Sequence, residues 1–144
     1  MNMKQSLREG IPVKYLDANV FIYAALNVER QGEGARALLQ RVQDGKDDCC
    51  SSALTFDEIV YVVGKHRNLE LGRIAGGAFL ELQGLDIIPV DEKLLHDTAR
   101  LIRIYNLKPR DAIHASSALL RGVQVMVSTD SDFDKVKELK RVGI

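Results

Sequence analysis

Short apolar runs alternate along this chain with stretches of helical periodicity, and this alternation constrains the fold more than any other feature. A short apolar run suits a buried strand, whereas apolar residues three and four positions apart suit a helix that covers one face of a sheet. Strands that alternate with helices form parallel βαβ units. The sequence therefore predicts an α/β fold with a mainly parallel central sheet, whose strands we expect at residues 13–16, 49–51, 85–90 and 125–129.

The segments between these strands predict helices. We expect helices from about Asn19, from about Ala35, over 55–66, over 70–82, after a capping Asp91, and around Asp111, with a polar loop over 27–34. The buried face of the helix after Asp91 is predicted to hold Leu94, Leu95, Thr98, Leu101 and Ile102. Gly76 and Gly77 lie inside the helix predicted over 70–82, and each glycine destabilises a helix by ~1 kcal/mol relative to alanine. We therefore expect close helix packing or a kink there.

Four acidic residues stand where a strand gives way to a helix or where a helix begins: Asp17, Glu58, Asp111 and Asp130. In an open α/β sheet, the ligand crevice lies outside the carboxyl ends of the strands. Carboxylates gathered there repel one another and raise one another's pKa, so a fold that keeps such a cluster favours a bound cation. Oxygen ligands are those preferred by Mg²⁺ and Mn²⁺, which we predict as the cofactors.

Each of these acids also has a structural interpretation. Asp17 suits a turn and Asp130 suits a helix cap. Asp111 would complement a helix dipole, while Glu58 has the spacing of a capping box with Thr55. These interpretations do not explain why four successive junctions each carry an acid, so the set favours a metal site.

Two polar residues near the acids need separate interpretation. His114 lies one turn after Asp111 on the same helical face, and we interpret it as a histidine that packs beside the core rather than as a catalytic group. Thr129 precedes Asp130 and is a candidate to bind a carboxylate or a phosphate, although a threonine at a strand end needs no such role.

Four sequence blocks, at residues 14–21, 52–58, 109–115 and 128–133, resemble in order the motifs of PIN-domain ribonucleases, especially those of the VapC-like branch. The resemblance covers about 13–136 and implies a three-layer PIN-like fold, with a central, mainly parallel sheet flanked by helices. It identifies as catalytic residues and metal ligands Asp17, Glu58, Asp111 and Asp130. It also implies Asp132 as a further metal ligand, and Asn19 joins Thr129 as a candidate substrate-binding residue.

The resemblance implies a metal-dependent endoribonuclease that hydrolyses RNA phosphodiester bonds, as the toxin of a toxin–antitoxin pair. Its expected partners are RNA, a small antitoxin protein and a second copy of the chain. The Gly76–Gly77 helix and the run Tyr61-Val62-Val63 are candidates for a partner surface. The alternatives are an RNA-processing PIN nuclease without an antitoxin, a phosphotransfer or phosphohydrolase site, and a non-catalytic PIN-like interaction module.

Composition is compatible with one nuclease domain over residues 1–144, in which 1–12 form an N-terminal extension. The formal charge is zero, from 20 basic and 20 acidic residues, which counts mildly against a strong non-specific nucleic-acid binder. Basic residues that could contact RNA nevertheless cluster at three places, namely 65–67, Lys108 with Arg110, and 135–141.

The two cysteines, Cys49 and Cys50, are adjacent and predict small core residues in a reducing compartment. The three histidines and this cysteine pair lack the ligand spacing of a zinc site. The longest apolar run, 20–26, is far shorter than the ~20 residues of a membrane span, and no apolar signal region stands at the N-terminus. We therefore expect a cytoplasmic protein.

Overall fold

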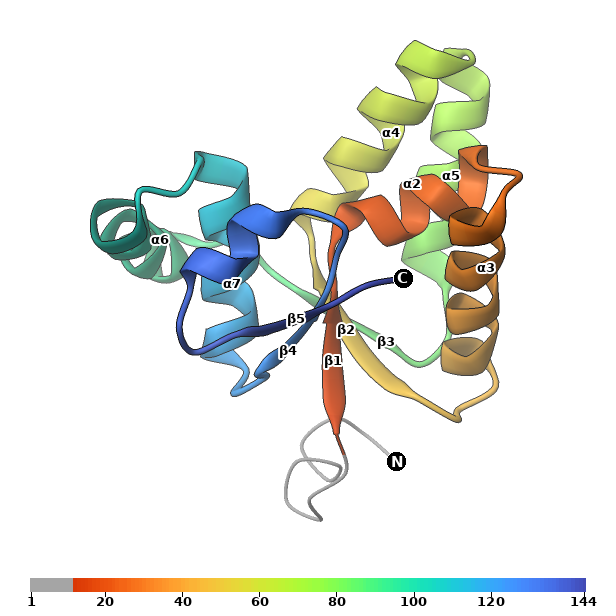
Figure 1. Ribbon diagram of the computed structural model, residues 1–144. Coiled ribbons are helices and arrows are strands. Elements are labelled where there is room, and N and C mark those ends of the chain that lie inside the picture. Colours follow the sequence, from red (N-terminus) through yellow and green to blue (C-terminus); the bar gives the residue numbers. More distant parts are fainter. Residues whose placement is uncertain (1–11) are drawn as a thin grey trace.

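A five-stranded parallel sheet forms the centre of the protein, as the computed structural model in Figure 1 shows for residues 12–144. Its strands are β1 (Val13–Leu16), β2 (Asp48–Ser52), β3 (Leu85–Ile88), β4 (Val125–Val127) and β5 (Lys140–Val142). They lie in the order β3-β2-β1-β4-β5, and every neighbouring pair is parallel. The predicted parallel sheet is confirmed. The predicted N-terminal extension lies, except for Pro12, outside the described residues.

Seven helical segments connect the strands of the described chain. They are α2 (Ala18–Leu26), α3 (Arg30–Gln43), α4 (Leu54–His66), α5 (Leu69–Glu81), α6 (Glu92–Tyr105), α7 (Pro109–Leu120) and the 3-10 turn η1 (Ser131–Lys135). Asp91 caps α6 as predicted, because its carboxylate accepts a hydrogen bond from the N–H of Leu94 at 2.9 Å.

Three details of the sequence prediction are wrong. The polar loop predicted over 27–34 ends early, because α3 begins at Arg30. The first turn of α3 is mostly exposed, so the sequence shows no apolar periodicity there. The last strand is not 125–129: β4 ends at Val127 and a further strand, β5, follows at the sheet edge, where Lys140 and Arg141 give no apolar signal. Leu95 is 44% exposed, since it is rotated away from the buried face that Leu94 occupies.

Helices cover both faces of the sheet, so the fold has the predicted three layers (Figure 1). Successive residues of a strand point to opposite faces. Tyr15 therefore joins the core on the side of α6 and α7, whereas Leu16 joins the core on the side of α2 to α5. Cys50 and Cys49 divide between the two faces in the same way, and both are free, buried thiols, as predicted. Burial raises the pKa of the Cys49 thiol to about 12.

The α4–α5 hairpin depends on glycines that permit close helix packing. A Cβ atom on Gly76 would lie 2.6 Å from Val60 Cγ2, and one on Gly72 would lie 2.6 Å from the carbonyl oxygen of Val60. The close packing expected at Gly76 is confirmed, but it occurs within the chain, so Gly76 does not offer a free surface for a second copy. Gly77 has open space around the corresponding position.

Gly72→Ala and Gly77→Ala are expected to change stability in opposite directions. Gly72→Ala forces a side chain against backbone and should lower the free energy of unfolding by ~1–3 kcal/mol. Gly77→Ala meets no neighbour and should raise it by up to ~1 kcal/mol, because alanine favours helix over glycine. Urea unfolding of both variants measures the difference, and equal stabilities would contradict the close approach of α5 to α4.

In the described part of the chain, none of the helices has the length and apolar character needed to cross a membrane.

Candidate functional site

The site lies where the strand order of the sheet reverses. The chain passes from β1 to β2 on one side and returns to β4 on the other, which leaves a crevice at the carboxyl ends of β1 and β4. Asp17 directly follows β1, and its N–H donates to the carbonyl of Val127 at 3.1 Å. Asp130 follows the end of β4 by three residues. The topology therefore brings these two acids, which are far apart in sequence, to the same edge.

Asp17 is nearly buried and caps α2. Its Oδ1 accepts from the N–H of Ala18 at 2.8 Å, and its Oδ2 accepts from the hydroxyl of Ser128 at 2.7 Å. Burial raises the pKa of Asp17 despite the opposing effects of His114 and of these hydrogen bonds, and Glu58 raises it further. Asp17 thus combines the role of a helix cap with a place in the acidic cluster.

Asp111, Asp130 and Asp132 form a group whose carboxylate oxygens lie within 4.8 Å of one another. Asp111 lies in the first turn of α7, and Asp130 caps η1 by accepting from the N–H of Asp132 at 2.9 Å. Burial and the charges of Asp130, Asp17 and Asp132, in this order, raise the pKa of Asp111 to about 6. Burial contributes most to this shift, and the neighbouring carboxylates add like-charge repulsion.

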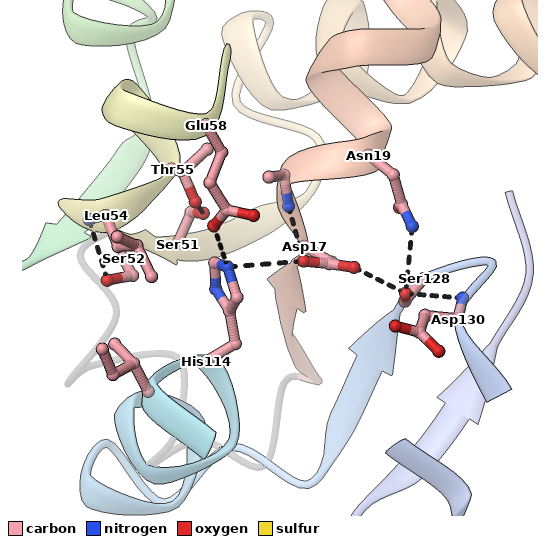
Figure 2. Close-up of polar contacts among 12 residues, drawn as sticks. Asp17, Asn19, Ser51, Ser52, Leu54, Thr55, Glu58, His114, Ser128 and Asp130 are labelled. Atoms are coloured by element: carbon pink, nitrogen blue, oxygen red, sulfur yellow. Dashed lines mark hydrogen bonds and ion pairs between the residues drawn. The ribbon is translucent and has the colours of Figure 1, made fainter. Parts of the chain in front are cut away.

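Glu58 and Asp17 meet at a third residue, His114 (Figure 2). The Nε2 atom of His114 lies 2.6 Å from Glu58 Oε1 and 3.5 Å from Asp17 Oδ1. On the other side of the ring, Nδ1 lies 2.6 Å from the hydroxyl of Tyr15. Burial lowers the pKa of His114, but the hydrogen bond to Glu58 and the charge of Asp17 outweigh it, so the pKa is raised above its ordinary value.

The capping-box interpretation of Glu58 is wrong. The capping position of α4 is Ala53, and no side chain caps it there. Thr55 instead shares a hydrogen bond with Ser51 at 2.8 Å, while Glu58 contacts His114. The contact with His114 on α7, and not the N-terminus of α4, therefore sets the orientation of Glu58.

Asn19, Ser128 and Thr129 form a polar group beside the acids. The side-chain amide of Asn19 donates to the hydroxyls of Thr129 at 2.9 Å and of Ser128 at 3.3 Å. The Oδ1 atom of Asn19 is buried and has no hydrogen-bond partner among the described residues. Ser128 also accepts from the N–H of Asp130 at 2.9 Å, so one hydroxyl links Asp17 to the loop that carries Asp130.

A cavity of about 590 Å³ opens beside the acidic residues of the site. Three acids line it, namely Glu58, Asp111 and Asp130, together with the segment 108–110. Both basic side chains of that segment, Lys108 and Arg110, are exposed. The cavity is therefore lined both by half-buried acids and by exposed basic residues.

The donor set of the group fits a hard divalent cation. Carboxylate oxygens are the ligands that Mg²⁺ and Mn²⁺ prefer. Like-charge repulsion adds to burial in raising the pKa of Asp111, and a cation at Asp111, Asp130 and Asp132 would relieve that repulsion. The family resemblance implied Asp17 and Glu58 as members of the same ligand set, and in the structure both lie close to His114. The ligand assignment itself stays a prediction.

His114 is the residue that sequence reasoning underestimated. It is buried as expected, but both of its ring nitrogens bind polar side chains. Its spacing of three residues from Asp111 was the only signal, and this spacing does not reveal that Tyr15 and Glu58 approach from other elements. Ser128 was likewise not singled out, since a serine after a strand is common.

Comparison with known proteins agrees with this fold. The model of the PIN domain family matches residues 14–139. A comparison with curated proteins finds no match. Similar solved structures include VapBC2 from Rickettsia felis bound to a DNA fragment from its promoter, with a TM-score of 0.69 and 19% identity over 91% of this chain and 98% of that chain.

Two further solved structures share the fold. VapC20 from Mycobacterium tuberculosis, described as a sarcin–ricin loop cleaving toxin, has a TM-score of 0.71 and 12% identity over 86% of this chain and 95% of its own. DNA-bound VapBC from Salmonella typhimurium has a TM-score of 0.67 and 21% identity over 92% of this chain and 98% of that chain. Because the family model extends over nearly all of the described residues, the chain belongs to the PIN domain family.

Proposed function

We propose that this protein, a single domain, is a metal-dependent endoribonuclease that hydrolyses RNA phosphodiester bonds. The observation that carries the proposal is the group Asp111, Asp130 and Asp132, which lies at the strand-order reversal of a PIN fold and two of whose members, Asp111 and Asp130, line a cavity. Asp17 and Glu58 lie at the same edge. A cation bound among these acids would relieve the repulsion between their charges.

Mg²⁺ or Mn²⁺ bound to these acids would lower the pKa of water and neutralise charge on the scissile phosphate. Asp111, Asp130 and Asp132 are the proposed ligands. Glu58 lines the same cavity and is the proposed base that accepts a proton from the attacking water. Asp17 orients the loop of Asp130, since Ser128 bridges the two residues.

Lys108 and Arg110 are the proposed contacts to RNA phosphates, because both are exposed and line the same cavity as the acids. Asn19 and Thr129, which hydrogen-bond each other beside Asp17, are proposed to contact the substrate. A neutral chain can bind RNA in this way if its exposed positive charges line the cavity and its negative charges face the cation.

The double variant Lys108→Ala/Arg110→Ala is expected to bind single-stranded RNA more weakly. The slope of log K against log salt concentration should become shallower by up to ~1.4, since each phosphate contact to a single strand contributes ~0.7. Fluorescence anisotropy in EDTA measures binding without cleavage. The matched control is Lys46→Ala/Lys93→Ala, which removes the same charge at two exposed positions that do not line the cavity; an equal change of slope in both variants would contradict the proposal.

We also propose that the chain is the toxin of a toxin–antitoxin pair. Similar folds occur in the VapBC complexes of Rickettsia felis and Salmonella typhimurium and in a toxin–antitoxin complex from Klebsiella pneumoniae. A homodimer is proposed as well, and the exposed apolar residues of α5, Leu69, Leu71, Ile74 and Leu80, offer a surface for it. Co-expression with the neighbouring short reading frame, followed by purification of a stable complex that does not cleave RNA, tests the antitoxin.

Cleavage by the purified chain tests the central proposal. Single-stranded and structured RNAs should be cut in Mn²⁺ or Mg²⁺ but not in EDTA, and single-stranded DNA of the same sequence should resist. Cleavage of one folded RNA at a defined position, without a co-expressed inhibitor, would favour the RNA-processing alternative. A folded protein that binds Mn²⁺ but cuts no RNA would support the non-catalytic module.

A further inference from the structure

His114 is the centre of a hydrogen-bonded chain that runs from Tyr15 in the core to Glu58 at the site. Figure 2 shows the contacts of His114 with Glu58 and Asp17. It lies on α7, whereas Tyr15 lies on β1 and Glu58 on α4, so three elements meet at one ring. Tyr15 is 0% and His114 1% exposed. Both contacts of the ring are short, at 2.6 Å. Glu58 alone of the three reaches the cavity.

The partners of the ring determine where its proton lies. An ionised carboxylate only accepts hydrogen bonds. Nε2 of His114 must therefore be protonated and act as the donor of the hydrogen bond to Glu58. The hydroxyl of Tyr15 pairs with Nδ1, either as donor to a neutral ring or as acceptor from a charged one. With both nitrogens occupied, the ring cannot turn without losing both hydrogen bonds.

The fixed ring of His114 in turn restricts the orientation of the Glu58 side chain. A free glutamate side chain loses up to ~2 kcal/mol of rotamer entropy when it is held in one position, so an unrestrained Glu58 would sample several orientations. The exposed faces of α4 supply no hydrogen bond to its carboxylate in the described residues, whereas His114 supplies one from the buried side. The same ring nitrogen lies 3.5 Å from Asp17, so it also faces the second acid of the edge.

We propose that His114 is a positioning residue that holds the Glu58 carboxylate toward the cavity and thereby places it for proton transfer. The inference rests on the proposed function for the role of Glu58. His114 acts through Glu58 and contacts neither RNA nor cation. Tyr15 holds the ring from behind. The pair extends the candidate site into the core on the side of α7.

Two substitutions of His114 distinguish the roles of its two ring nitrogens. In His114→Gln the side-chain amide nitrogen approximates Nε2 and retains a donor to Glu58; in His114→Asn it approximates Nδ1 and faces Tyr15 only. His114→Asn should lower kcat about 10–100-fold with KM little changed, as loss of a supporting hydrogen bond does, whereas His114→Gln should stay within about fivefold of wild type. His96→Gln, at an exposed histidine of α6, is the control and should match wild type.

A second measurement, by proton NMR, does not depend on RNA cleavage. The proton on Nε2 of buried His114 should give an exchange-protected imidazole resonance in the proton NMR spectrum, since His66 and His96 are exposed and exchange rapidly. Glu58→Ala should remove the protection and His114→Asn should remove the resonance. Calorimetric Mn²⁺ affinity should remain within about threefold in the His114 variants, because the proposed ligands are three other residues.

The outcomes distinguish this inference from the proposed function. Equal activity of His114→Asn and wild type would overturn the positioning role, as would a parallel loss of cleavage and Mn²⁺ affinity or a protected resonance that survives Glu58→Ala. Absence of RNA cleavage by wild type would overturn the proposed function instead, and the NMR arm would still decide whether His114 holds Glu58. In a Glu58→Ala background, His114→Asn should have no further effect on kcat.

Discussion

Replacing Asp111 with asparagine is expected to lower metal-dependent RNA cleavage by roughly 10²–10³-fold, the usual effect of removing one group that acts on transition-state charge. Asp111 belongs to the three-carboxylate group and lines the cavity, so its loss removes a proposed cation ligand. Single-turnover cleavage at saturating RNA measures the effect. Asp57→Asn, which removes one exposed charge from α4, should leave cleavage unchanged.

The same substitution should not destabilise the metal-free protein. The pKa of Asp111 is raised from 3.8 to about 6, so between these values the folded state binds more protons than the unfolded state. The wild-type free energy of unfolding should therefore fall as pH rises from about 4 to about 6, and Asp111→Asn should show a flatter profile and equal or greater stability at pH 7. A destabilised variant that still cleaves RNA would identify Asp111 as a structural residue and overturn its assignment as a ligand.

Addition of Mn²⁺ is expected to stabilise the fold substantially. A cation that binds only the native state adds about 2.7 kcal/mol to the free energy of unfolding at 100 times its Kd. For a domain of this size the melting temperature should rise by roughly 5–10 °C. Calorimetry with and without Mn²⁺ measures the shift, which EDTA should reverse.

Asp130→Asn is the matched test of this prediction. It removes a proposed ligand while asparagine can still accept the N–H hydrogen bond that caps η1. The variant should fold but lose most of the Mn²⁺-dependent shift. An unchanged melting temperature of the wild type at millimolar Mn²⁺, or the same shift in Asp130→Asn, would contradict a cation site at this group.

The local pattern of residues was sufficient to predict the sheet, its helices and the edge at which the acids gather. Apolar periodicity is a property of neighbouring residues, and parallel strands always present their carboxyl ends at one edge. The junction positions of Asp17 and Asp130 therefore predicted their proximity. The same reasoning failed for β5 and for the first turn of α3, because short polar elements at the surface bury too little to show a period.

Only the tertiary structure decided which acids form the three-carboxylate group and which lie close to His114. His114 contacts Tyr15 across 99 residues of sequence and Glu58 across 56, and no local pattern encodes contacts over such separations. The grouping of Asp111 with Asp130 depends on how α7 packs beside the loop after β4. The sequence by itself thus determined which acids gather at this edge of the sheet, whereas long-range packing determined which of them form the proposed cation group and which contact His114.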